Sequence, residues 1–266
     1  MISDKKYNHI IFTEEENIAT ITLNRPEKFN ALQFPLLMEI VDALETIQKI
    51  KYIRVIIIQG SGKNFCSGDD IVSMGPDGVK FAPLEDGSRL PHHRVVRLIR
   101  EIQKPVIALL QGYCLGAGFD LAVACDFRLA ADNLKIGDFR ISRAICVMSG
   151  ASWFLPKLIG FARATDIILT GRLLDAKEAL EIGLINKFYP LSDFKVESKR
   201  YINKISEMPT KAIGYNKTML NYSLCHDLFP SLQNEFKLYC KNIRTYDFGE
   251  GMKSFIKKRD PKFKGR

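Results

Sequence analysis

The pattern of apolar and polar positions divides the chain into a β/α portion and a helical C-terminal portion. Two β-rich segments, residues 9–12 and 18–23, flank a polar turn and predict an opening hairpin. Apolar residues at helical spacing across 36–47 predict a helix, and the apolar run 55–58 predicts a buried strand. Because strand, strand and helix recur along the chain, we expect a spiral of stacked ββα units. From about Ser192 the pattern predicts four helical pieces.

The stretch 104–126, KPVIALLQGYCLGAGFDLAVACD, is the one around which these elements are organised. Residues 105–110 read as a buried strand and 117–124 as an apolar helix, joined by a turn that contains glycines at 112, 116 and 118. The first N–H groups of such a helix have no intrahelical partner. Asp120 places a lone carboxylate beside them. Free amides next to a carboxylate suit an enzyme that stabilises an oxyanion and moves a proton.

A strand, a glycine-rich turn and a helix also occur in nucleotide-binding crossovers and in buried structure without a chemical role. Here the glycines are spaced GxxxGxG rather than GxGxxG, and the motif lies in mid-chain. Both features disfavour a dinucleotide site.

Composition is typical of a globular protein, with 46% hydrophobic and 26% charged residues among 266. The net charge of +9 has three explanations: nucleic acid, an anionic small molecule such as one that carries phosphates, or a solvated basic face. Lys and Arg are enriched locally only near the C-terminus. The segment 75–91 is rich in Gly, Pro and charge, and we expect it to be mobile.

The six cysteines form no CxxC pair and have no histidine at zinc-site spacing, so no metal site is expected. Four of them lie in apolar or small-residue contexts, as reduced core thiols do. The N-terminal residues contain neither a secretory nor a transit pattern, and no apolar run approaches the roughly 18 residues of a membrane span. We therefore expect a cytoplasmic protein.

Five segments together resemble the crotonase, or enoyl-CoA hydratase/isomerase, superfamily. They occur in that family's order and spacing and cover nearly the whole chain from about Ile18. The segments are NRPEKFNAL (24–32), FCSGDDI (65–71), the stretch 104–126, LTGRLLDAKEALEIGLINK (169–187) and EGMKSFIKKRDPKF (250–263).

The resemblance implies an α/β fold, a crotonase-like spiral of ββα units with a C-terminal α-helical trimerisation region. The corresponding division is a core at 1–191 with the acyl-CoA site and a helical oligomerisation region at 192–266. It further implies a homotrimer or a dimer of trimers, an acyl-CoA substrate, and no cofactor beyond the coenzyme A moiety. Neither a membrane nor a nucleic acid is an expected partner.

The same resemblance assigns an oxyanion hole and a binding surface. The backbone N–H groups of Asp69 and Ala117 would hold the thioester carbonyl, which suits a reaction that places negative charge on that oxygen. Lys28 and Lys258 are candidate phosphate partners, and Phe255 and Lys258 would reach the nucleotide from a neighbouring subunit. The full set implied for substrate and coenzyme A binding is Lys28, Phe29, Ala31, Cys66, Gly68, Asp70, Ile71, Gly116, Met148, Phe255 and Lys258.

The chain departs from the family pattern at the acidic positions. Hydratases of this family use two acids on one water, and these fall on Asp120 and Arg140; a third acidic position, used by some relatives, falls on Met148. A single carboxylate suffices for double-bond isomerisation. Hydration by Asp120 alone requires a backbone group or a histidine to orient the water. Burial would raise the pKa of Asp120, whereas Arg140 and the helix N-terminus would lower it.

Arg140 and His93 are further candidates. Arg140 could grip a substrate carboxylate, support an oxyanion, or pair with Asp138 or another structural acid. His93 falls where a coenzyme A dehalogenase relative places a catalytic histidine, and its alternative is a surface histidine before a helix.

The leading hypothesis is an acyl-CoA lyase or isomerase that acts through an enolate, with enoyl- or dienoyl-CoA hydratase placed first. Isomerisation of a double bond, and decarboxylation or hydrolysis of a carboxylated or cyclic acyl-CoA, remain alternatives. The hypothesis from another class is an inactive protein that binds acyl-CoA or RNA.

Overall fold

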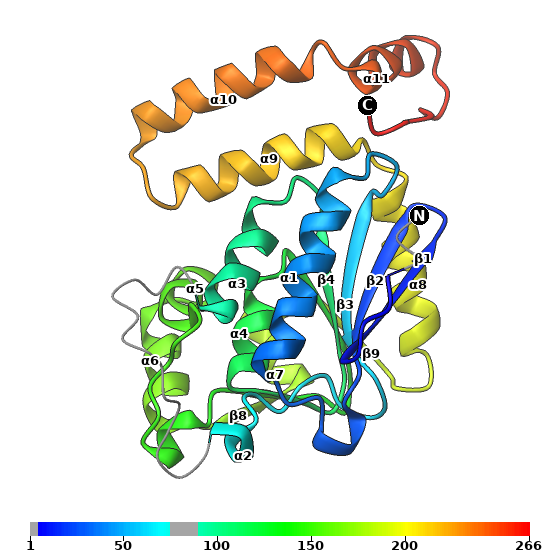
Figure 1. The fold of residues 1–266 in the computed structure, drawn as a ribbon. Helices are drawn as coiled ribbons and strands as arrows, with labels where there is room; N and C mark the ends of the chain where they lie inside the picture. The colour runs from blue at the N-terminus through cyan, green and yellow to red at the C-terminus, as the bar shows by residue number, and fades with distance from the viewer. Residues whose placement is uncertain (1–4, 75–89) are drawn as a thin grey trace.

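The computed structural model describes residues 5–74 and 90–266 (Figure 1). The segment predicted to be mobile therefore lies, apart from Leu90 and Pro91, outside the described residues. Within those ranges, no helix combines the length and the apolar character needed to cross a membrane.

The main sheet has six strands in the order β1-β2-β3-β4-β6-β9. The predicted opening hairpin is confirmed, because β1 and β2 pair antiparallel; the other neighbours pair parallel. Strands of a parallel sheet are covered on both faces, which accounts for apolar runs such as VIIIQG in β3. The strands are β1 (Ile10–Glu15), β2 (Ile18–Leu23), β3 (Val55–Gly60), β4 (Val106–Leu110), β6 (Phe127–Ala131) and β9 (Lys187–Tyr189).

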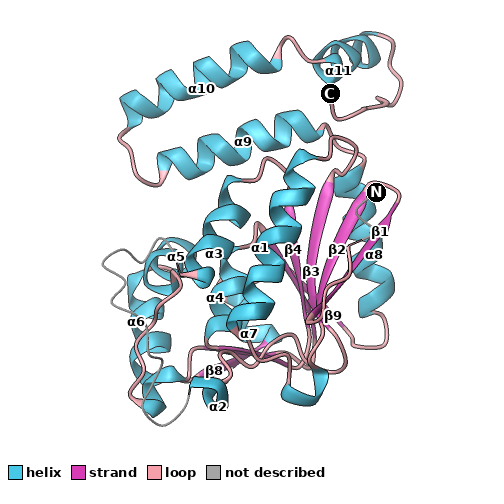
Figure 2. Cartoon of the chain, viewed as in Figure 1, coloured by secondary structure: helices cyan, strands magenta, loops and turns pink. Residues whose placement is uncertain are grey.

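Helices cover the two faces of this sheet, as Figures 1 and 2 show. Alternate residues of β3 point to opposite faces, so Ile56 and Ile58 join the larger core while Val55 and Ile57 join the smaller one. The larger core is closed by α1 (Phe34–Lys49), α3 (Pro91–Glu101) and α4 (Ala117–Ala124), and the smaller one by α8 (Phe194–Ser206).

A second, three-stranded sheet lies beside the first and carries the glycine-rich turn. Its order is β5-β7-β8, with β5 at Tyr113–Leu115, β7 at Lys135–Gly137 and β8 at Leu173–Asp175. Around it are α2 (Ile71–Met74), a 3₁₀ turn at Arg140–Arg143, α5 (Ala151–Ile159), α6 (Phe161–Thr170) and α7 (Ala176–Glu181).

The last third of the chain is helical, as predicted. Helices α9 (Thr210–Ser223) and α10 (Leu228–Asn242) form an antiparallel pair at one end of the molecule, followed by α11 (Tyr246–Ile256) (Figure 1). The division into residues 1–191 and 192–266 stays a prediction. Helix α8, although it follows residue 192, packs on β3, β6 and β9.

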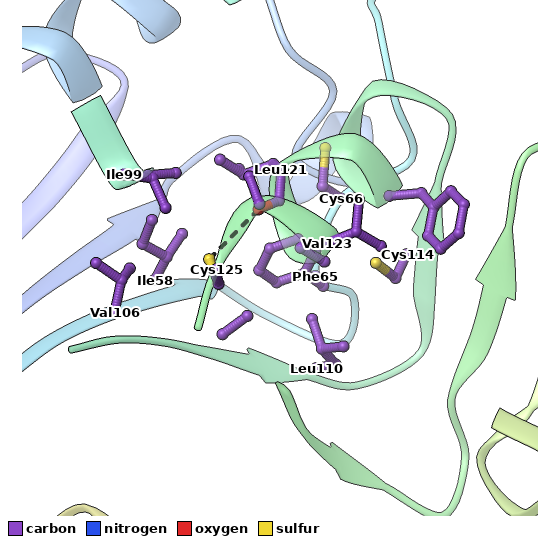
Figure 3. Close-up of a cluster of buried hydrophobic side chains, with 14 of the residues drawn as sticks. Ile58, Phe65, Cys66, Ile99, Val106, Leu110, Cys114, Leu121, Val123 and Cys125 are labelled. Atoms are coloured by element: carbon purple, nitrogen blue, oxygen red, sulfur yellow. Dashed lines mark hydrogen bonds between the residues drawn. The ribbon is translucent and has the colours of Figure 1, made fainter. Parts of the chain in front are cut away.

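Three cysteines, rather than the four expected, are buried, and they surround α4 in the larger core (Figure 3). Cys66, Cys114 and Cys125 are free thiols. Burial raises the pKa of Cys66 to about 12 and that of Cys125 to about 12, so both stay protonated at neutral pH. Cys125 donates to the Leu121 carbonyl at 3.3 Å. These thiols therefore belong to the packing around α4.

Candidate active site

Segment 65–70 lies between two other loops and is hydrogen-bonded to both. On one side, Leu32 donates to the Gly68 carbonyl at 2.7 Å and Asp70 donates to the Leu32 carbonyl at 2.8 Å. On the other side, Cys66 forms a parallel bridge with Cys114 at the start of the glycine-rich turn. The sequence places these segments far apart, and the bridges bring them into one layer.

Two glycines allow this close approach. Gly68 has φ +100° and Gly116 has φ +55°, conformations that side chains disfavour. A Cβ atom at Gly68 would lie 3.0 Å from the Leu115 carbonyl oxygen and 3.4 Å from the Ala117 nitrogen. Any larger residue at position 68 would therefore occupy the space next to the Ala117 amide.

The N–H groups of Asp69 and Ala117 are free within the part of the chain that the structure describes. The Gly68 carbonyl and the Asp70 N–H both bond to Leu32, so the Asp69 N–H between them faces the opposite side, where the turn before α4 lies. Ala117 is the first residue of α4, and its N–H has no intrahelical acceptor. Neither amide donates to another described residue.

A cavity of about 440 Å³ opens at this junction. Nine of the residues singled out from the sequence line it: Lys28, Phe29, Ala31, Gly68, Asp69, Asp70, Ile71, Gly116 and Arg140. Glu27, Ser67, Phe139, Arg143 and Ile145 complete the lining. The structure thus brings the predicted loops together around one space. Cys66, Ala117, Asp120, His93, Met148, Phe255 and Lys258 are outside this lining set.

Arg140 connects two buried carboxylates. Its Nη1 donates to Asp120 Oδ2 at 2.8 Å and its Nη2 donates to Asp120 Oδ1 at 2.9 Å. Its Nε donates to Asp138 Oδ1 at 2.8 Å and its Nη2 donates to Asp138 Oδ2 at 2.5 Å. The predicted contact with Asp138 is therefore present, together with one to Asp120. The guanidinium, rather than the Asp120 carboxylate, faces the cavity, and Asp120 has 0% exposure.

The pKa values of this group follow from its burial and charge balance. Burial raises the pKa of Asp120 by more than the charge and hydrogen bonds of Arg140 lower it. Burial alone would lower the pKa of Arg140, but the hydrogen bonds that it donates to Asp138 and the charge of Asp120 hold it above its ordinary value. The charge of Asp138 adds to the effect of burial and raises the pKa of Asp120 further.

The sequence analysis missed His92 and favoured its neighbour. His92 has 5% exposure, and its Nε2 lies 2.7 Å from Asp69 Oδ1. His93 lies in the first turn of α3 rather than before a helix, and its Nε2 donates to the Met148 carbonyl at 2.8 Å. The available signal was helical spacing, because His92, Val95 and Ile99 lie on one buried face of α3.

Comparisons with known proteins agree on one family. The family model described as Enoyl-CoA hydratase/isomerase matches residues 13–266. The chain belongs to the enoyl-CoA hydratase/isomerase family.

Relatives of this family match along the whole chain. A probable enoyl-CoA hydratase of Mycobacterium tuberculosis is 35% identical over 260 residues, covering 98% of this chain and 99% of its own. A crotonyl-CoA hydratase of Syntrophomonas wolfei is 33% identical over 97% of this chain and 98% of its own. The crystal structure of an enoyl-CoA hydratase from Bacillus anthracis superposes with a TM-score of 0.90 at 31% identity, covering 97% of this chain and 100% of that one. The crotonase fold expected from the sequence is thus confirmed.

Two positions that the family resemblance assigns to coenzyme A lie far from the cavity of this enoyl-CoA hydratase/isomerase family member. Phe255, near the end of α11, is 84% exposed, and Lys258 follows just after that helix. In Figure 1, α11 lies at the opposite end of the molecule from α2, which begins at the cavity residue Ile71. Neither side chain therefore contributes to the lining of this cavity within one chain.

Proposed function

We propose that this protein is an acyl-CoA lyase, an enoyl-CoA hydratase, in which the N–H groups of Asp69 and Ala117 hold the thioester carbonyl. The observation that carries the proposal is a pair of amides with no acceptor in the described part of the chain, on loops that meet at the cavity. The names of the relatives, probable enoyl-CoA hydratase and crotonyl-CoA hydratase, support the same reaction.

The two amides suit this reaction because negative charge develops on the thioester carbonyl oxygen that they would hold. Addition of water at C3 of an enoyl thioester moves electrons to the carbonyl oxygen, which becomes enolate-like. Two donors fixed before the reaction stabilise that oxygen without reorganising, and the loss of one such donor costs about 2.7–4 kcal/mol in the barrier.

Asp120 is the proposed acid/base. It lies in the first turn of α4, in the same helix as the Ala117 donor, and burial raises its pKa above the ordinary value, as is common for acid/base groups. Arg140 holds both oxygens of Asp120, so it must release one of them before Asp120 exchanges a proton with the substrate.

The coenzyme would run along the loop at 28–31. Lys28 and Phe29 are exposed at the cavity and suit a phosphate and an adenine face, respectively. Phe255 and Lys258 would reach the nucleotide from a neighbouring copy in a homotrimer or a dimer of trimers. Residues 192–266 would form that assembly, in which exposed apolar side chains of α10 such as Phe229 and Phe236 become buried. No further cofactor is proposed, and the proposed compartment is the cytoplasm.

A second candidate is a double-bond isomerase of acyl-CoA esters. It is favoured by Arg140, which stands where the resemblance to hydratases calls for a second acid. One base that removes a proton from one carbon and returns it to another is sufficient for this reaction.

The test is mass spectrometry of enoyl-, dienoyl- and carboxyacyl-CoA esters incubated with the protein in deuterated water. The proposal predicts a product heavier than the substrate by one water. Deuterium exchange without that gain identifies an isomerase, and loss of CO₂ identifies a decarboxylase. No change with any ester contradicts an enzymatic role. Asp120→Asn should abolish turnover with acyl-CoA affinity kept within a few fold, and full turnover in that variant removes Asp120 from the mechanism.

A further inference from the structure

We propose that the carboxylate of Asp69 is the second acid/base group of this site and that His92 positions it. The inference rests on the proposed function, because it supplies the partner that Asp120 needs for two-acid hydration. It replaces the acid that the family pattern places at 140, a position that this chain fills with arginine.

Asp69 is one of the carboxylates that line the cavity, and its own amide is one of the two proposed oxyanion donors. Its side chain is 16% exposed and lines the cavity, whereas Asp120 has 0% exposure behind Arg140. The neighbouring Asp70 also lines the cavity, but its Oδ2 accepts from Arg25 Nη2 at 2.8 Å. Asp69 therefore offers carboxylate surface to a bound molecule without breaking an ion pair with a guanidinium.

Covalent geometry keeps this carboxylate in the region of the thioester. The amide nitrogen of Asp69 is separated from its own carboxyl carbon by three bonds. If that amide holds the thioester oxygen, the carboxylate lies in the same part of the cavity as the carbonyl end of the substrate. The two carboxylates also interact electrostatically, since the charge of Asp69 contributes to the raised pKa of Asp120.

His92 fixes one oxygen of Asp69 and leaves the other available. Its Nε2 lies 2.7 Å from Oδ1, and its ring meets Phe34 edge-on with centroids 6.0 Å apart. The buried Nδ1 of His92 has no partner among residues 5–74 and 90–266, which favours the tautomer that donates from Nε2 to Asp69. In the same part of the chain, Asp69 Oδ2 has no hydrogen bond. This oxygen can accept a proton.

The step balances with water as the only co-reactant. Asp69 takes one proton from a water molecule while the water oxygen forms a bond to C3. The C2=C3 π electrons form a bond from C2 to the proton that Asp120 delivers. The product is the 3-hydroxyacyl thioester, and return of the proton from Asp69 to Asp120 resets the site.

The decisive variant is Asp69→Asn, because it keeps the backbone N–H of the oxyanion hole and removes only the acid/base. We expect kcat for hydration to fall about 100-fold or more, while KM changes by no more than a few fold. A kcat within about 3-fold of the wild-type value overturns the proposal. A rise in KM with kcat unchanged also overturns the proposal, because that result assigns Asp69 to substrate binding.

The positioning role of His92 is tested by a matched pair. His92→Gln keeps an N–H donor near the Nε2 position, whereas His92→Leu removes it. We expect His92→Leu to lose roughly 10-fold or more in kcat and His92→Gln to recover most of that loss. Equal activity of the two variants contradicts positioning through this hydrogen bond. The control is Glu45→Gln, which removes a partly exposed ion pair between α1 and Arg94 of α3, the helix that carries His92. It should leave kcat unchanged.

The outcomes separate this inference from the proposed function. Turnover retained in Asp69→Asn but lost in Asp120→Asn rejects the role of Asp69 and leaves the hydratase standing. If the wild-type protein hydrates none of the esters, both proposals fail. If His92→Leu does not fold, the kcat of His92→Gln and Asp69→Asn still decides the question.

Discussion

The two ends of α4 carry buried charges that are arranged differently. At the N-terminal end, Arg140 is shared by Asp120 and Asp138, and the amide of Ala117 has no acceptor among the described residues. Just past the C-terminal end, Lys217 of α9 donates to Asp126 Oδ2 at 2.6 Å, to the Ile99 carbonyl at 2.7 Å and to the Lys104 carbonyl at 3.1 Å.

The difference lies in hydrogen-bond satisfaction rather than in access to a cavity. A cavity of about 410 Å³ also lies beside Lys217 and Asp126. There, however, all three N–H donors of the ammonium group are engaged, and the Val106 N–H donates to Asp126 Oδ2 at 2.8 Å. Saturated charges stabilise a fold, whereas unpaired donors beside shared carboxylates are available to a substrate. We therefore assign a structural role to the charges at the C-terminal end of α4 and a catalytic role to the groups at its N-terminal end.

The largest expected effect is on stability, at the C-terminal end. Lys217→Met removes the buried ammonium group from Asp126, which then keeps only the longer contact with Arg100 Nη1 at 3.6 Å. We expect the free energy of unfolding to fall by about 3 kcal/mol. Urea denaturation at a fixed protomer concentration measures it. Adding Asp126→Asn should restore part of the loss, and kcat of the folded fraction should stay unchanged. A large loss of kcat in the folded protein would contradict a purely structural role for Lys217 and Asp126.

The next effect is on activity, at the N-terminal end. Ala117→Pro removes one oxyanion donor at the first helical position, where proline is tolerated. We expect kcat to fall about 10²–10³-fold, with the melting temperature little changed. Steady-state kinetics and a thermal melt of the same sample check both parts. Wild-type kcat in this variant would show that the amide is not a donor to the reacting oxygen.

The pH dependence of stability sharpens the contrast further. The folded protein has a higher pKa at Asp120 than the ordinary value of 3.8, so it binds a proton that the unfolded chain releases. The contribution of Asp120 to stability therefore falls as pH rises from 3.8 through the folded pKa. In Asp120→Asn this slope should be absent, as measured by unfolding free energies across that range. Parallel curves for the two proteins would contradict the raised pKa.

The smallest effect is expected where a charge pair is exposed. Arg97 and Glu101 of α3 approach to 3.7 Å, and both side chains are more than half exposed. Arg97→Gln should change the free energy of unfolding by less than about 0.5 kcal/mol. A larger change, measured by urea denaturation, would mean that charge alone sets the contribution of an ion pair to stability, without burial and hydrogen bonding.

The sequence predicted local elements well because their signals are local. The bounds of α4 follow from an apolar run that begins directly after glycines. The loop segments of the cavity were predicted through the family resemblance, which fixes their order and spacing. Of the three-stranded sheet, only β7 was predicted, as a short strand at residues 134–136. Strands β5 and β8 were missed because three residues are too few to show an alternating pattern.

Contacts between distant residues could not be predicted in the same way. His92 and Asp69 are separated by 23 positions, and Lys217 and Asp126 by 91. The contact of Arg140 with Asp138 was foreseen because the two are two residues apart, but its contact with Asp120 depends on how β7 packs beside the turn before α4. Likewise, the direction of the Asp120 pKa shift depends on burial that no sequence pattern quantifies.

The central claim is that two amides polarise one thioester carbonyl, and infrared spectroscopy of a bound acyl-CoA labelled with ¹³C at that carbonyl tests it most directly. The account predicts a carbonyl band at lower wavenumber in the complex with the wild-type protein than in water, and a band shifted much less in the complex with Ala117→Pro. Bands at the same position in the two complexes, with the ligand fully bound in both, would contradict it.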